Sequence, residues 1–156
     1  MRKFLLVLGA LTFAVILAAG AGFGILIYKG VALDAESKTF VDKAVPPIIA
    51  SLNKEQFLDR TAPELRNNLR PGELNGLFEA LSRLGPLIEY QGATGGVNMA
   101  YTGGVGGSVS ASYVANAKFK DGNATMRIAL LKRDGRWMIS GFHVDTTLSG
   151  APSRGT

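Results

Sequence analysis

Three patterns of apolar and polar residues follow one another along the chain. Residues 4–28 carry no charge, with Arg2 and Lys3 before them and Lys29 after them. In the next part of the chain apolar residues recur every three or four positions, which is the spacing of amphipathic helices. Beyond residue 86 the period becomes two, as expected for strands with one buried face. This order predicts a membrane segment, then helices, then an antiparallel sheet.

Residues 4–28 are long enough to cross a membrane as one helix. At about 1.5 Å per residue they span roughly 37 Å, against a hydrocarbon core of about 30 Å. A cleaved secretory signal is the alternative, because Ala19 to Ala21 form an A-x-A-like cleavage site after a basic start. Cleavage would leave residues 22–28 as an apolar tail. We therefore expect a signal anchor over residues 1–29, with secretion after cleavage near Ala21 as the alternative.

The charges beside this segment predict its orientation. Arg2 and Lys3 precede it, and only Lys29 follows before the acidic Asp34 and Glu36. Since basic residues concentrate on the cytoplasmic side, we expect the N-terminus to stay in the cytoplasm and the rest of the chain to be exported. In a cell with two membranes this describes a single-pass inner-membrane protein with a periplasmic domain.

Small residues recur at four-residue intervals within the predicted anchor. They are Ala10, Ala14, Ala18 and Gly22, with Gly20 and Gly24 on an adjacent face. This spacing lets two membrane helices approach closely, which predicts a protein partner or a homo-oligomer in addition to the contact with membrane lipid. Alternatively, the pattern only reflects how common alanine and glycine are in export segments.

The composition excludes several kinds of chemistry. The 156 residues include no cysteine and one histidine, which removes disulfides, thiolate metal sites and cysteine nucleophiles. We therefore expect no metal and no cofactor. Without Arg2 and Lys3 the net charge of +5 falls to +3, and the remaining basic and acidic residues are scattered. This argues against nucleic acid as a partner.

Helices are expected after a juxtamembrane linker at residues 30–36. Asp34 is suited to cap a helix that reaches about Leu52, and Pro46-Pro47 either bends this helix or ends it near Val45. Two short pieces follow, capped by Asn53 and by Thr61, and a last helix covers residues 73–84. The apolar stripe of this last helix consists of Leu74, Leu77, Phe78, Leu81 and Leu84, and Gly85-Pro86 stops it.

The sheet is expected to begin at residues 87–91, and residues 97–102 either continue this strand or pair with it. Seven glycines between Gly92 and Gly107 predict a flexible or bulged hairpin tip, because the lysine or helix that a phosphate-binding loop needs does not follow. Three strands come next, at residues 109–120, 124–133 and 136–146. The turns between them are expected at Gly122-Asn123 and Asp134-Gly135.

These turns predict a register for the last three strands. They set Phe119 opposite Met126, Ala117 opposite Ile128, Ala115 opposite Leu130, Leu130 opposite Ile139, and Ile128 opposite Gly141. One face of the sheet is then continuously apolar. The same register places Tyr113, Trp137, His143 and Asp145 on the apolar face, and Met138, Phe142 and Val144 on the other.

Helices followed by an antiparallel meander predict an α+β fold, in which a transmembrane helix precedes a cone of helices packed on a curved antiparallel sheet. From about residue 34 to residue 146 the element order, with the pattern D-G-x-W-x-I at residues 134–139, resembles the nuclear transport factor 2-like (cystatin-like, ketosteroid-isomerase-like) superfamily. The resemblance implies a pocket between helices and sheet. The exported α+β domain is expected over residues 37–147 and a disordered tail over residues 148–156.

The superfamily includes isomerases, dehydratases, binding modules and membrane-anchored assembly proteins, so the fold alone does not assign an activity. The candidate ligand-binding residues are Tyr113, His143, Asp145 and Tyr90, since a histidine and a carboxylate two apart on a strand share a face. No catalytic set is complete, which predicts a non-enzymatic domain that binds a partner protein or a small ligand, for example in envelope assembly. The alternative is a pocket enzyme or hydrophobic-ligand binder that uses His143, Asp145 and Tyr113.

Overall fold

The computed structural model describes residues 31–100 and 108–150 of the chain. Two compact units are distinguished, Met1–Ala35 and Glu36–Thr156, and the fold below is that of the second. Among the described residues no helix is both long and apolar enough to cross a membrane. The predicted anchor, its helix-pairing residues and residues 151–156 of the predicted tail lie outside the described residues.

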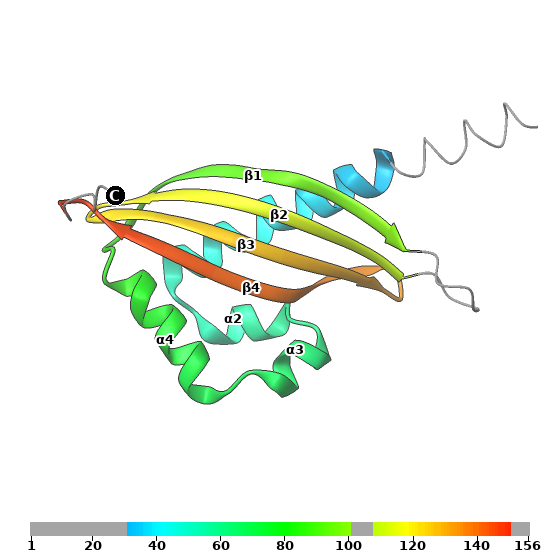
Figure 1. Ribbon diagram of the computed structural model, residues 1–156, viewed down its shortest axis with the longest axis horizontal. Coiled ribbons are helices and arrows are strands. Elements are labelled where there is room, and N and C mark those ends of the chain that lie inside the picture. Colours follow the sequence, from blue (N-terminus) through cyan, green and yellow to red (C-terminus); the bar gives the residue numbers. More distant parts are fainter. Residues whose placement is uncertain (1–30, 101–107, 151–156) are drawn as a thin grey trace, which may run out of the picture. The chain divides into compact units, whose positions relative to one another are not determined.

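The second unit has the predicted α+β fold (Figure 1). Residues 31–51 are helical, so most of the predicted linker is already helix and Asp34 lies within the helix instead of capping it. Three shorter helices follow: α2 (Lys54–Asp59), α3 (Pro63–Asn68) and α4 (Pro71–Ser82). The strands are β1 (Leu87–Ala100), β2 (Ser108–Phe119), β3 (Gly122–Arg133) and β4 (Arg136–Leu148). They form one curved antiparallel sheet in the order β1-β2-β3-β4.

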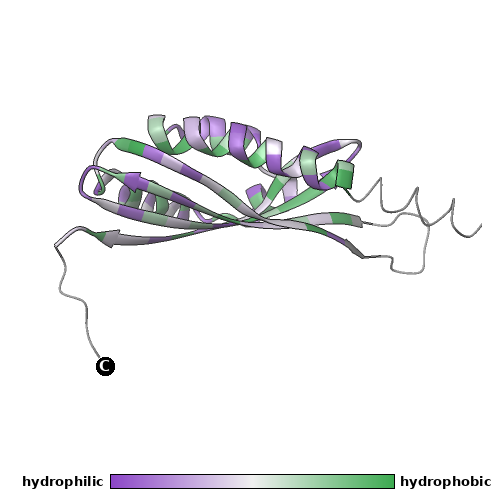
Figure 2. Cartoon of the chain, turned by 90° about the horizontal axis from the view of Figure 1, so that it is seen from above, coloured by the Kyte–Doolittle hydropathy of each residue, from purple (hydrophilic) through white to green (hydrophobic). Residues whose placement is uncertain are grey.

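One face of the sheet, here called the inner face, forms the core with the helices. Apolar and polar residues alternate along the strands (Figure 2), and in β2 and β3 every second side chain is buried. The buried residues of these strands are Ala111, Tyr113, Ala115, Ala117, Phe119, Ala124, Met126, Ile128 and Leu130. Several are alanines, which leave room for the first helix to pack its own buried residues Val41, Ala44, Val45, Ile48 and Ile49.

The first helix is continuous through Pro46-Pro47, so neither the break nor the restart near Val45 occurs. Each proline removes one intrahelical hydrogen bond, which is normally costly. Val45, Ile48 and Ile49 are buried on both sides of the pair. The burial of this apolar stripe offsets the lost hydrogen bonds and keeps the helix in one piece.

The helix caps are only partly as predicted. Asn53 does cap α2, because its side-chain oxygen accepts from the Gln56 N–H at 3.1 Å. The prediction for Thr61 was wrong: its hydroxyl donates to the Phe57 carbonyl at 2.7 Å, and α3 begins after Ala62. Thr61 instead forms a parallel bridge with Ile139 of β4. This bridge pairs part of the free edge of β4.

The turns also differ in one place. Asp134 and Gly135 have φ angles of 51° and 76° and form the expected tight turn between β3 and β4. The first turn lies at Lys120 and Asp121 and not at the predicted Gly122-Asn123, since Gly122 pairs with Phe119. A Cβ at Gly122 would lie 2.2 Å from the Thr147 carbonyl oxygen, so close packing and not a turn requires glycine there.

A bulge in β4 changes which residues face the core. Leu130 pairs with Ile139 as predicted, but Ala129 pairs with Gly141 and Ile128 with Phe142, so Ser140 is an extra residue. The prediction of Ile128 opposite Gly141 was therefore wrong. Beyond the bulge Phe142 and Val144 lie on the inner face, and His143 and Asp145 lie on the other, outer face, which reverses the predicted sides.

Candidate functional site

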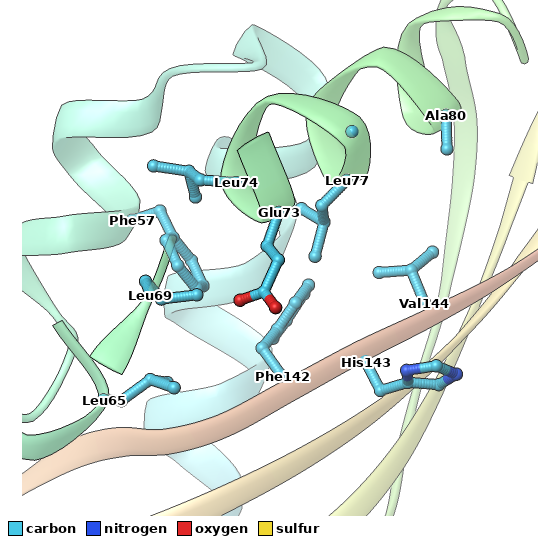
Figure 3. Close-up of a pocket in the computed structure, with 11 residues that line it drawn as sticks. Phe57, Leu65, Leu69, Glu73, Leu74, Leu77, Ala80, Phe142, His143 and Val144 are labelled. Atoms are coloured by element: carbon cyan, nitrogen blue, oxygen red, sulfur yellow. The ribbon is translucent and has the colours of Figure 1, made fainter. Parts of the chain in front are cut away.

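The candidate site is a groove of about 480 Å³ between α3, α4 and β4, here called the α3–α4 groove (Figure 3). Its walls are mainly aliphatic. They comprise Leu65 and Leu69 at α3, Leu74, Leu77 and Ala80 on α4, and Phe142 and Val144 on β4. Most of these side chains are only half-buried. The groove is therefore an apolar surface that the rest of the domain leaves uncovered.

The deep side of the groove is an aromatic cluster. Phe57 of α2 is 1% exposed, and its ring contacts those of Phe78 and Phe142 edge to face at centroid distances of 6.0 and 5.3 Å. Edge-to-face pairs at these distances are attractive beyond the area they bury. The cluster connects α2, α4 and β4 and gives the groove a well-packed base.

The apolar stripe of α4 explains why the groove exists. Phe78 and Leu81 of α4, and Leu84 just after the helix ends, are buried in the core, whereas Leu74 and Leu77 are half-buried and line the groove. The last turns of the stripe thus belong to the core and the first turns to the groove. The sequence predicted the whole stripe as one helix face and did not separate the two parts. The length of the apolar stripe, which exceeds what the core buries, was the available sign of an uncovered surface.

Glu73 is the carboxylate that lines the groove. Figure 3 shows its carboxylate directed between Leu69 and Phe142. The backbone N–H of Arg70 donates to one carboxylate oxygen at 3.3 Å, a long hydrogen bond at the start of α4. Among the described residues no ion pair of Glu73 is found. A negative charge that is exposed to water therefore lies beside an apolar surface.

His143 also lines the α3–α4 groove at its β4 wall (Figure 3), and together with Asp145 it belongs to a charged cluster on the outer face. The His143 Nε2 lies 3.2 Å from one Asp145 carboxylate oxygen, and the Arg127 guanidinium lies 2.8 Å from the other. The side chains of all three are more than half exposed, at 62%, 57% and 60% respectively. Exposed pairs of this kind contribute little free energy.

This charged cluster borders a shallow hollow on the outer face. The hollow measures about 490 Å³, and small residues, among them Ser112, Ala129 and Gly141, form its floor. Arg127 and His143 also line it. Tyr113 contributes to its lining but is 2% exposed and points into the core with the inner-face residues. The structure thus does not bring Tyr113 together with His143 and Asp145 in one cavity.

Tyr113 holds the first helix to the sheet. Its hydroxyl lies 2.7 Å from the Ser37 hydroxyl, and Ser37 is fully buried. A hydrogen bond between two buried hydroxyls satisfies groups that would otherwise be costly to desolvate. The contact accounts for Tyr113 in structural terms.

Tyr90 has a similar position on β1. Its hydroxyl donates to a carboxylate oxygen of Asp42 at 3.0 Å, and the Ala93 N–H donates to the same oxygen at 3.2 Å. Gln91 and Gly92 form an irregularity in the β1–β2 pairing just before Ala93. Asp42 thus provides an acceptor for a backbone donor next to this irregularity, and Lys38 pairs with its other oxygen at 2.5 Å. Burial and the neighbouring Asp42 carboxylate raise the pKa of Tyr90.

We expect Tyr90→Phe to lower the free energy of unfolding by about 1 kcal/mol at pH 8, because one hydrogen bond is lost. The pKa of Tyr90 is raised in the folded state, whereas the unfolded tyrosine loses its proton near its ordinary pKa of 10.0. The Tyr90 contribution is therefore present below pH 10 and is lost as the pH rises further. Urea unfolding of both proteins at pH 8 and 10.5 measures this difference, and a difference independent of pH would contradict the assignment.

A further pocket, of about 440 Å³, lies beside Trp137 and the β3–β4 turn. Much of the charge around it is internally compensated. Arg133 pairs with Glu64 at 2.6 Å, and Lys132 pairs with Glu36 and lies 5.5 Å from the centroid of the Trp137 ring. The Lys132 ammonium lowers the pKa of Glu36. These groups stabilise one another, whereas Asp59, Asp134 and Arg136, which also line the pocket, have no ion pair among the described residues.

Within residues 31–100 and 108–150 no group of three histidine, aspartate or glutamate side chains could hold a metal ion. Comparison of the chain with protein-family models, curated proteins and solved structures finds no match. The resemblance to the nuclear transport factor 2-like superfamily therefore stays a prediction. The fold and the groove carry the functional argument.

Proposed function

We propose that this chain is a non-enzymatic, membrane-tethered binding domain. Residues 4–28 anchor it in the inner membrane with the N-terminus in the cytoplasm, and the domain that begins near residue 36 lies in the periplasm. There the α3–α4 groove takes an apolar segment of a partner protein. The observation that carries the proposal is the groove itself, an apolar surface on a domain with a complete core.

The composition of the groove supports a protein segment as its occupant. Amphipathic helices dock by placing an apolar stripe into a groove between helices, and leucine and phenylalanine walls are suited to this mode. Covering the half-buried Leu74, Leu77 and Val144 removes apolar surface from water, which favours binding. A tethered domain also meets other membrane-anchored proteins at high local concentration.

The arrangement of the sequence candidates does not support the alternative of a pocket enzyme. Acid–base catalysis needs its groups within hydrogen-bond reach of one substrate. Tyr113 is bound to Ser37 in the core, while His143 and Asp145 lie on the exposed outer face. These three side chains do not form an acid–base set.

Because the chain has no cysteine, a single introduced thiol tests the groove. We would place Ala80→Cys, on the groove wall, or Ile88→Cys, 60% exposed on β1, in the full-length chain in lipid nanodiscs. The probe is a 12-residue peptide of leucine and glutamine with leucines at helical spacing and one cysteine. At each position we would measure the equilibrium constant for replacing a mercaptoethanol mixed disulfide with the peptide disulfide. We expect this constant to be at least about fivefold larger at Ala80→Cys than at Ile88→Cys, which corresponds to about 1 kcal/mol of binding.

Two glycine substitutions on α4 provide a matched control. A Cβ at Gly72 or at Gly76 meets no heavy atom within 4 Å and both glycines are exposed, so either position has room for the start of a side chain, but only Gly76 lines the groove. We expect Gly76→Phe to abolish the preference for Ala80→Cys and Gly72→Phe to leave it unchanged. Equal disulfide formation at residues 80 and 88 would refute a groove that binds apolar segments.

A further inference from the structure

The charge at the edge of the groove gives the chemistry of its occupant. Resting on the proposed function, we infer that the bound segment is basic, with one lysine or arginine placed against the Glu73 carboxylate. The partner of stated chemistry is thus an amphipathic segment with leucine-like side chains on one face and a cation beside them.

Covering Glu73 with a bound segment has a cost. Its carboxylate lies between Leu69 and Phe142, so a segment that fills the groove also removes water from this charge. A carboxylate that loses water without gaining a new partner is disfavoured, and the long bond from the Arg70 N–H satisfies only one of its oxygens. A purely apolar segment therefore binds against a penalty that a cation removes.

A second glutamate on the same helix, Glu79, differs from Glu73 in its pairing. Glu79, two turns further along α4, is paired with Arg83 at 2.7 Å and does not line the groove. The Glu79 side chain is 63% exposed and Glu73 is exposed as well, so the two carboxylates differ in their pairing and not in their access to water. Glu73 has no such pair among the described residues and is in the groove wall. The charge of Glu73 is thus available to a ligand, and that of Glu79 is not.

The overall charge of the exported part makes the inference specific. Residues from Lys29 onward carry an excess of basic over acidic side chains, so the general field of the domain favours an acidic peptide. A preference for a basic peptide at the groove must then arise locally. Glu73 and Ala80 are seven residues apart, about 10.5 Å along one side of α4, which sets the spacing between cation and cysteine in a test peptide.

The test uses the Ala80→Cys chain in nanodiscs and three peptides that differ at one position, seven residues from the cysteine. This position is lysine, glutamine or glutamate. We expect the equilibrium constant for disulfide formation to be about two- to fivefold larger for the lysine peptide than for the glutamine peptide, which is the usual range for a partly exposed ion pair. For the glutamate peptide we expect it to be smaller than for the glutamine peptide. Glu73→Gln should make the three peptides equal, and Glu79→Gln should not.

The outcomes separate the two proposals. If the glutamine peptide is not enriched at Ala80→Cys over Ile88→Cys, the groove does not bind apolar segments and the proposed function fails. If the glutamine peptide is enriched but the three peptides react equally with the Ala80→Cys chain that keeps Glu73, the groove binds apolar segments and the inference of a basic partner is wrong. A charge preference that survives Glu73→Gln assigns the cation to another carboxylate and also overturns the inference.

Discussion

Phe57→Ala is expected to lower the free energy of unfolding by about 3 to 5 kcal/mol, the usual cost of removing a buried aromatic ring. Phe57 is 1% exposed and its ring touches those of Phe78 and Phe142. The substitution removes the buried ring surface and both ring contacts, and α2, α4 and β4 all lose a shared neighbour. Because a domain of this size is stable by only about 5 to 15 kcal/mol, much of its stability is at stake.

Urea unfolding of the full-length chain, followed by the fluorescence of Trp137, measures this loss. Two variants serve as controls. Phe57→Leu keeps most of the volume and should cost less than about 2 kcal/mol, and Phe40→Ala removes an equal ring from a half-buried position and should cost clearly less than Phe57→Ala. Equal costs at residues 40 and 57 would show that the aromatic cluster does not hold the three elements together.

The apolar periodicity of the sequence was enough to predict the fold class and most elements. Strict alternation in β2 and β3 defines one buried face whatever the exact register, and this is why the predicted apolar face survived an incorrect first turn. The observed pairs Ala117 with Ala124 and Ala115 with Met126 are shifted by four residues from those predicted. A shift by an even number keeps every side chain on its face.

The predicted face of His143 and Asp145 was wrong because the register shift there is odd and not even. Ser140 adds one residue to β4 at the bulge, and an odd shift moves all later side chains to the other face. Gly141 is an isolated glycine within a strand, which is a signal for a bulge, but the glycine alone does not fix where the extra residue is inserted. The bulge is favourable in the folded domain because it brings Phe142 onto Phe57 and leaves the polar His143 and Asp145 in water.

The candidate site needed tertiary information that no local pattern contains. Leu74 and Leu77 belong to a regular apolar stripe, and only the positions of α3 and β4 show that these two residues line an open groove. Glu73 looks like an ordinary acidic residue in the first turn of a helix, where carboxylates are common. Its place between Leu69 and Phe142 gives it a functional interpretation.

Removal of the predicted anchor is expected to have the largest effect on where the protein is found. In a bacterium with an outer membrane, the full-length chain should stay in the membrane pellet after an alkaline carbonate wash and keep residues 1–29 in its intact mass. Alkaline phosphatase fused after residue 150 should be active, since the fusion point lies on the periplasmic side. Deletion of residues 2–28 should leave the domain in the cytoplasm and the fused phosphatase inactive.

A point substitution tests whether residues 4–28 direct the chain to the membrane, and the mass and solubility of the unsubstituted chain distinguish an anchor from a cleaved signal. Ile16→Arg introduces a charge at the centre of residues 4–28, where it disfavours membrane insertion by about 2.5 to 3.5 kcal/mol, whereas Ile16→Leu changes little. We expect the arginine variant to lose most of its membrane fraction and its phosphatase activity, and the leucine variant to keep both. An unsubstituted chain found soluble in the periplasm, with a mass that begins near residue 22, would favour cleavage after Ala21 and refute the tether. Binding at the α3–α4 groove would be unaffected by that outcome, because all the residues that line the groove lie in the unit Glu36–Thr156.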